Sequence, residues 1–158
     1  MYNLSFGIII YIPFTESVLE GNLNIIKTAY NACSGGSYKN DFVNICNLKA
    51  VLKQGVRCLD FEIYSVKDQP VVSTSTTDNY YVKETFNSVN FGSVMETIKN
   101  YAFAGGTCPN PTDPLLIHLR IKSNNQDMYT KLANILKSYD DIMLGKEFSF
   151  ENSGENLG

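Results

Sequence analysis

The sequence predicts an α/β fold in which β/α units build a parallel sheet. Short runs rich in β-branched residues alternate along the chain with longer amphipathic segments. Residues 115–121 are almost wholly apolar, which is typical of a buried parallel strand. This alternation favours two architectures, an open doubly wound sheet and a (β/α)₈ barrel.

The expected elements follow in chain order. In the first helix, apolar residues that include Phe42 recur at three- and four-residue spacing. Asp41 is a suitable N-cap for this helix and Gly55 a suitable stop, and Asn90 is a suitable N-cap for the second helix. We predict strands at residues 24–30, 56–64, 70–75 and 115–121, and helices at about 41–54, 91–102 and 125–139.

The N-terminal residues form a short unit of their own. An apolar run at residues 8–12 lies between Gly7 and Pro13 and is too short to cross a bilayer, which takes about 20 residues. It lacks the charged segment and cleavage site of a signal peptide, so it supports no targeting prediction. Its β-branched residues favour a buried strand over the two alternatives, a clipped anchor and an artefact of the start of the chain. We assign residues 1–23 to this strand and its lead-in, and residues 24–158 to a single domain.

The composition limits the classes of partner. A chain of 158 residues that is 44% hydrophobic and 18% charged suits one soluble domain. Its 13 Lys and Arg against 16 Asp and Glu give a net charge of −3, and the basic residues are scattered singly. This pattern offers no electrostatic footprint for nucleic acid or anionic lipid. We therefore expect no nucleic-acid partner, and any phosphate-bearing ligand would be held by local contacts.

Glycine-rich nucleotide loops are absent from the sequence. It has neither GxGxxG nor GxxxxGK[ST], so the open nucleotide-binding sheet loses its usual support. A complete (β/α)₈ barrel takes roughly 250 residues. The 158 residues would therefore fill little more than half of a barrel.

The four cysteines predict no zinc site. Their spacing contains no CxxC pair, and His118 is the one histidine in the sequence. Buried thiols are the expectation, with Cys58 in the core because it lies inside an apolar strand. One disulfide among Cys33, Cys46 and Cys108 remains an open alternative.

Four blocks carry a family resemblance. They are residues 48–64 (LKAVLKQGVRCLDFEIY), residues 70–72 (PVV), the apolar positions within residues 91–103, and residues 114–120 (PLLIHLR). Their order and spacing resemble the X region of phosphatidylinositol-specific phospholipase C. The stretches AYNACSGG (29–36) and TCPNP (107–111) are similar in particular to degenerate phospholipase-C-like proteins of large DNA viruses.

The resemblance implies a fold and a chemistry. The fold would be a TIM-type barrel, of which this chain would hold about half to two thirds. In the family, two histidines act as acid and base while the inositol 2-hydroxyl attacks the phosphorus, and calcium held by Asn, Glu, Asp and Glu offsets the developing charge. Bacterial phospholipases of the superfamily use an arginine in place of calcium. Imidazole suits this chemistry because it titrates near neutral pH.

Neither catalytic histidine is kept at the matching positions. The first falls on Tyr30, and the second falls within residues 73–76, where Thr76 is the nearest equivalent. His118 lies elsewhere, and one imidazole cannot serve as both acid and base unless a neighbouring carboxyl has a shifted pKa. The resemblance thus implies an impaired catalytic site.

The metal-ligand positions are kept in part. The family's asparagine ligand falls on Asn31, and its Glu-x-Asp pair falls on Asp60 and Glu62 with the side-chain lengths exchanged. Its last ligand glutamate falls on Arg120. Asn31, Asp60 and Glu62 are therefore the residues that would hold calcium, and calcium would be expected only if the chain is an enzyme. Otherwise we expect no cofactor.

Strand geometry brings the same residues together. Residues two apart in a strand share a face, so Cys58, Asp60 and Glu62 point one way, as do His118 and Arg120. A guanidinium opposite two carboxylates would form a charge-assisted pair in roughly the place of a calcium ion. We predict that Arg120 lies within salt-bridge reach of Asp60 or Glu62.

Each candidate also has a structural interpretation. Asp60 and Glu62 belong to an ion-pair network with Arg120, line a ligand pocket, or bind a metal. His118 is a hydrogen-bonded core residue or a recruited catalytic group, and Asn31 is a turn residue or a ligand.

Three further polar features also have two interpretations each. Residues 73–77 end a strand or supply a nucleophile, and the first alternative is preferred because no histidine accompanies them in sequence. Arg57 and Lys122 contact solvent or a phosphate, and solvent is preferred for both.

Three functions follow from these observations. The first is a phospholipase-C-like X-domain protein, catalytically impaired and retained as a binding or structural module, with an inositol phospholipid headgroup as partner. The second is an active phosphoric diester hydrolase that cleaves phosphatidylinositol-type lipids. The third, by fold-level analogy, is a virion component of a large DNA virus. In each case we expect further chain or a neighbouring protein to complete the barrel.

Overall fold

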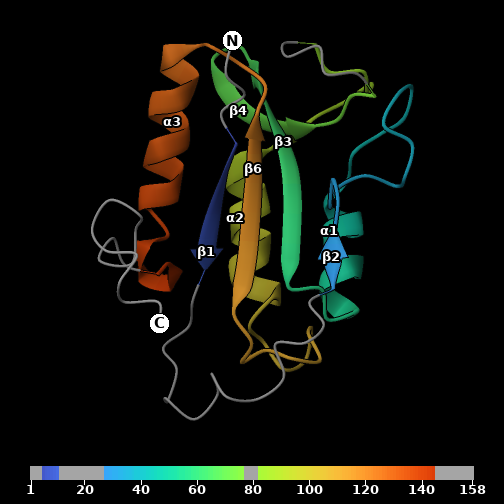
Figure 1. Ribbon diagram of the computed structural model, residues 1–158, viewed down its shortest axis with the longest axis vertical. Helices are drawn as coiled ribbons and strands as arrows, with labels where there is room; N and C mark the ends of the chain where they lie inside the picture. The colour runs from blue at the N-terminus through green and yellow to red at the C-terminus, as the bar shows by residue number, and fades with distance from the viewer. Residues whose placement is uncertain (1–4, 11–26, 77–81, 145–158) are drawn as a thin grey trace.

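The computed structural model describes residues 5–10, 27–76 and 82–144, with side chains described from residue 27 onward. These ranges form a curved sheet with helices against it (Figure 1). The strands are β1 (Ser5–Ile10), β2 (Thr28–Ala29), β3 (Cys58–Val66), β4 (Gln69–Ser73), β5 (Val89–Asn90) and β6 (Leu115–Ile121). The helices are α1 (Ile45–Lys53), α2 (Phe91–Tyr101) and α3 (Gln126–Lys137), followed by a 3₁₀ helix (Asp140–Ile142). The predicted α/β class is confirmed.

The sheet has the order β1-β6-β3-β4-β5, with β2 paired to β3. Both β2 and β6 run parallel to β3, which gives the curled half-barrel that the predicted partial TIM-type barrel requires. By contrast, β1 pairs antiparallel with β6, and β4 pairs antiparallel with β3. The expectation of a purely parallel sheet was therefore wrong at these two strands. Residues 11–23 of the predicted lead-in and residues 24–26 of the second predicted strand lie outside the described residues.

A tight turn explains the antiparallel pairing of β4. Lys67 and Asp68 connect β3 to β4, and both have positive φ, 50° and 58°. Two central residues with positive φ make the turn whose twist matches that of antiparallel strands. The chain therefore folds back after β3 instead of crossing over to a parallel strand.

The helix caps test the predicted boundaries. Asn90 caps α2 as predicted, because its side chain accepts a hydrogen bond from the backbone of Gly92. In α1 the predicted cap Asp41 was wrong, since the helix begins later and Asn44 accepts from Cys46 N. Phe42 is consequently outside the helix, 58% exposed and in contact with the Phe86 ring.

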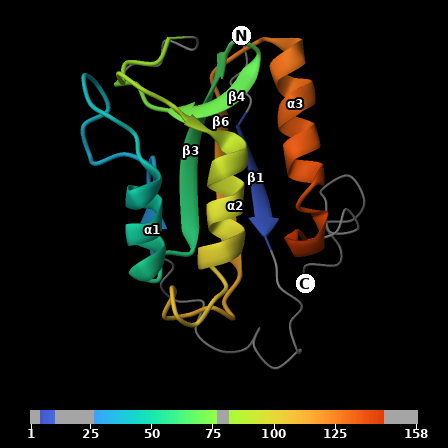
Figure 2. The ribbon, with the colours of Figure 1, turned by 180° about the vertical axis from the view of Figure 1, so that it is seen from behind.

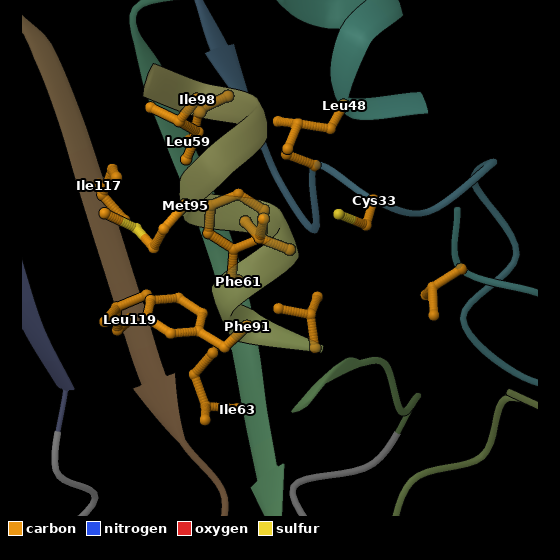
Figure 3. Packing of buried hydrophobic residues seen from close by; sticks show 14 of the residues in the cluster. Cys33, Leu48, Leu59, Phe61, Ile63, Phe91, Met95, Ile98, Ile117 and Leu119 are labelled. Carbon is orange, nitrogen blue, oxygen red and sulfur yellow. The ribbon is translucent and has the colours of Figure 1, made fainter. Parts of the chain in front are cut away.

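A hydrophobic core lies between the sheet and the helices. Figure 2 shows α1 and α2 in front of the sheet, so they cover a single face of it. The side chains that meet there come from β3, β6, α1 and α2 (Figure 3). They include Leu48, Leu59, Phe61, Ile63, Phe91, Met95, Ile98, Ile117 and Leu119, all of which are almost fully buried. Because β3 and β6 turn these residues toward the helices, their alternate residues face the other side of the sheet.

All four cysteines are free thiols, so the alternative of a disulfide was wrong. Cys33 and Cys108 are buried and Cys46 is exposed. Cys58 is partly exposed and lies on the polar side of β3, so its predicted place in the core was also wrong. Burial raises the pKa of the Cys33 thiol to about 12, which keeps that thiol protonated and unreactive.

Candidate functional site

A polar cluster occupies the face of the sheet opposite the core. Asp60 and Glu62 on β3 lie directly beside His118 and Arg120 on β6 in the parallel register. In Figure 1 this face of β3 and β6 is turned toward the viewer, and no described helix covers it. The strand geometry expected from the sequence is therefore confirmed for these four residues.

Arg120 forms the centre of the cluster. Its Nε and Nη2 donate to the two carboxylate oxygens of Asp60 at 3.0 and 2.6 Å, and its Nη1 donates to Glu62 Oε1 at 2.6 Å. The side chains of Asp60 and Glu62 are only 7% and 3% exposed, and that of Arg120 is 18% exposed. The predicted salt bridge is confirmed, and it is a bidentate pair with Asp60 joined to a second pair with Glu62.

The turn after β2 adds an amide and an aromatic ring. Asn31 has a φ of 47°, a left-handed conformation that asparagine tolerates better than most residues. Its backbone N–H donates to Asp60 Oδ1 at 3.2 Å, and its side-chain oxygen accepts from Arg120 Nη2 at 3.0 Å. Tyr30 lies over the guanidinium of Arg120, 4.4 Å from ring centroid to Cζ. Asn31 is thus both a turn residue and a member of the cluster.

Glu62 has further donors on its second oxygen. The hydroxyl of Tyr64 donates to Glu62 Oε2 at 2.5 Å, and the backbone N–H of Ser75 donates to the same atom at 3.1 Å. Burial, followed by the hydrogen bond to Glu62, raises the pKa of Tyr64, so this phenol stays protonated. Both oxygens of Glu62 therefore act as acceptors within the protein.

Asp60 and Arg120 each stabilise the charged form of the other. Burial alone would raise the pKa of Asp60, but the hydrogen bonds from Arg120 and His118 outweigh it and hold the pKa below the ordinary value. Burial likewise acts to lower the pKa of Arg120, and the neighbouring Asp60 and Glu62 reverse this and raise it. The pair is therefore fully ionised at neutral pH.

His118 is hydrogen-bonded as predicted, although it is not a core residue. Its Nδ1 lies 2.7 Å from Asp60 Oδ2. Its side chain is 38% exposed, because β6 carries it on the open face of the sheet.

The two positions matched to the family's histidines are occupied by side chains with other tasks. Tyr30 is 56% exposed and stacks on Arg120. The Thr76 hydroxyl donates to Glu84 Oε2 at 2.6 Å. Sequence reasoning missed Glu84 altogether, since its partners come from separate segments and no motif surrounds it.

The remaining polar candidates lie inside the protein. Ser73 is fully buried and its hydroxyl is hydrogen-bonded to that of Thr85, in agreement with a polar strand end.

Arg57 and Lys122 were expected in solvent, and this was wrong, because they are only 6% and 5% exposed. Arg57 donates to the backbone carbonyls of Ala102 and Asn110, so it links separate loops of the fold. Lys122 is enclosed at the end of β6, where its N–H donates to the carbonyl of Ile63.

A calcium ion does not fit this donor set. Asn31, Asp60 and Glu62, which would hold calcium, each accept at least one hydrogen bond from Arg120 on a side-chain oxygen. A cation among them would be placed against the guanidinium and would lose the ligand oxygens to it. Within residues 27–76 and 82–144, moreover, no group of three or more His, Cys, Asp or Glu side chains is arranged to hold a metal ion.

Comparison with known protein families identifies the domain. The model of the family described as phosphatidylinositol-specific phospholipase C, X domain, matches residues 24–155. The chain belongs to this family. A comparison with curated proteins gave no match. Among the described helices of this X domain, none is both long enough and apolar enough to cross a membrane.

Proposed function

We propose that the chain is a phospholipase-C-like X domain without efficient phosphodiesterase activity, retained as a binding module. The observation that supports this most strongly is the position of Arg120. Its guanidinium engages Asn31, Asp60 and Glu62 at once, and Tyr30 lies over it. The positions that hold calcium in the family thus form an ion-pair network in this chain.

Proton transfer is the first step that this arrangement impairs. Burial raises the pKa of Tyr30 above its ordinary value, so the phenol is a poor base near neutral pH. The Thr76 hydroxyl does not titrate in this range, and it donates to Glu84. Each general acid or base contributes roughly 10²–10⁴-fold to a rate, so losing both removes most of the catalysis.

Stabilisation of the transition-state charge is the second part of catalysis that this arrangement impairs. Arg120 supplies a positive charge at the position where the family would hold calcium, but two buried carboxylates more than offset that single charge. The guanidinium is already neutralised and is held by four hydrogen bonds. It therefore contributes little to stabilising the negative charge that develops in a transition state. The cluster is therefore suited to holding the strands together.

A phospholipid headgroup remains the partner that the family membership supports. The buried side-chain nitrogen of Asn31 has no hydrogen-bond partner among the described residues. Buried amide donors are normally paired. This buried donor would be satisfied by a water molecule, or by a ligand oxygen that enters the cluster beside Arg120.

Turnover of phosphatidylinositol tests the proposal. The purified chain is incubated with phosphatidylinositol vesicles, with calcium and with a chelator, and released inositol phosphate is measured beside an active member of the family. We expect no release above background in either condition. Robust calcium-dependent release would overturn the proposal.

A residual hydrolase is the second candidate, and one contact favours it. The 2.7 Å contact between His118 Nδ1 and Asp60 orients an imidazole in the way that carboxylates orient catalytic bases. If slow release is detected, His118→Gln abolishes it when the imidazole is the base. Release that is unchanged in the variant would exclude His118 from the chemistry.

A further inference from the structure

A second polar cluster adjoins the Arg120 network where β4 ends, and Glu84 is its centre. Glu84 Oε2 accepts from the Ser75 hydroxyl at 2.9 Å, and from the Thr76 backbone N–H and the Thr76 hydroxyl at 2.6 Å each. Its Oε1 lies 3.4 Å from the ammonium of Lys39. Hydrogen bonds from three separate groups and an ion pair therefore converge on one carboxylate.

Glu84 Oε2 accepts more hydrogen bonds than one carboxylate oxygen can accept with good geometry. Such an oxygen offers about two lone-pair positions, and three donors share Oε2. A backbone N–H, two hydroxyls and an ammonium are the groups that bind oxyanions in proteins. A phosphate group, with more oxygens than a carboxylate, would distribute the same donors without crowding.

We propose that Glu84 is an internal anion that fills an oxyanion cradle formed by Lys39, Ser75 and Thr76, and that the cradle binds the phosphate group of a ligand when this carboxylate is displaced. The role of Glu84 is independent of whether the domain turns over lipid. It also connects the cradle to the Arg120 network, because the Ser75 N–H donates to Glu62 while the Ser75 hydroxyl donates to Glu84.

The backbone of Glu84 is held independently of its side chain. Its N–H donates to the carbonyl of Thr74 at 2.9 Å, and its carbonyl accepts from the N–H of Asn40 at 3.0 Å. Removing the side chain therefore empties the cradle and leaves the segment attached on both sides. The hydrogen bonds from Thr76 contribute most to lowering the pKa of Glu84 to about 2, so in the wild-type protein the cradle holds a charged carboxylate at neutral pH.

Titration with inorganic phosphate tests the cradle. Phosphate binding is measured by the shift of the Thr76 amide resonance in the wild-type protein and in Glu84→Ala. We expect affinity for phosphate to rise about tenfold or more in the variant, because repulsion is removed and charge-assisted donors are released. Glu84→Gln, whose side chain still fills the cradle, should show a smaller rise.

Asp141→Ala is the matched control. It removes a carboxylate that pairs with Lys99 at 2.7 Å, so it changes the net charge equally and also releases a lysine. An equal gain in Asp141→Ala and Glu84→Ala would overturn the proposal. Adding Thr76→Val to Glu84→Ala should remove most of the gain, and a gain that survives this change would also count against the cradle.

Two further experiments address a variant that fails to fold and the kind of molecule that carries the bound phosphate. If Glu84→Ala fails to fold, it is refolded in phosphate and in chloride of equal ionic strength. Recovery specific to phosphate supports the cradle, and equal recovery in both overturns it. Flotation of Glu84→Ala with vesicles of phosphatidylcholine and phosphatidylinositol 4-phosphate shows whether the cradle reaches a lipid headgroup, and binding of free phosphate without flotation identifies a small soluble anion as its ligand.

Discussion

Replacing Arg120 by alanine is expected to destabilise the domain strongly. The substitution removes four hydrogen bonds and leaves two ionised carboxylates in places where they are 7% and 3% exposed. Breaking a buried ion pair from one side typically costs about 3–5 kcal/mol. Because Arg120 itself is 18% exposed, we expect the lower end of that range, about 3 kcal/mol.

Urea denaturation followed by far-ultraviolet circular dichroism measures this loss. With an m-value of about 2 kcal/mol/M, the midpoint should fall by about 1.5 M at neutral pH. The control is Lys99→Ala, whose partner Asp141 is 61% exposed and whose ion pair should contribute no more than about 1 kcal/mol. A loss in Arg120→Ala no larger than in this control would refute the account of the network.

The pH dependence of the same variant gives a second criterion. The pKa of Asp60 is lowered by folding, so its contribution is present above its ordinary value of 3.8 and is lost as the pH falls through the folded value. The difference between Arg120→Ala and the wild-type protein should thus be largest near neutral pH and shrink below about pH 4. A difference that stays constant down to pH 2 would contradict this explanation.

Three other predictions concern parts of the fold outside the Arg120 network. Glu84→Gln should lower stability at neutral pH, and acid unfolding should show this deficit disappearing as the pH falls from 4.5 to about 2, because the pKa of Glu84 is lowered to about 2. A deficit independent of pH would count against the charged carboxylate. Exposed Cys46 should react first with a thiol reagent, and buried Cys33 should react only on unfolding. Peptide mass mapping measures both rates of modification, and equal rates for the two thiols would contradict the described burial. Asn90→Ala should cost about 1 kcal/mol in urea unfolding through loss of the α2 cap, and no change would mean that the cap is dispensable.

Elements governed by local signals were predictable from the sequence. The three- and four-residue spacing of apolar residues and the cap at Asn90 predicted α2, and β6 coincides with the predicted strand at 115–121. The start of α1 was missed because Val43, just before it, is held by the side chain of Asn87, a contact over long sequence distance. Periodicity alone could not show that this contact keeps Phe42 out of the helix.

The candidate site was predictable where strand parity decides the geometry. Residues two apart on β3 and β6 placed the carboxylates opposite Arg120, and register made them partners. Arg57 and Glu84 were not predictable, because the groups around them come from segments whose approach depends on the whole fold. The viral origin suggested by two short stretches of sequence stays a prediction.

Calcium titration tests the central claim most directly, namely that the guanidinium of Arg120 occupies the position of the family's cation. Amide resonances of Asn31, Asp60 and Glu62 are followed as calcium is added to the wild-type protein and to Arg120→Gln, which removes the charge and keeps most of the side-chain volume. The account predicts no saturable shift in the wild-type protein and a gain of calcium affinity in Arg120→Gln. Saturable calcium binding by the wild-type protein at these three residues would contradict it.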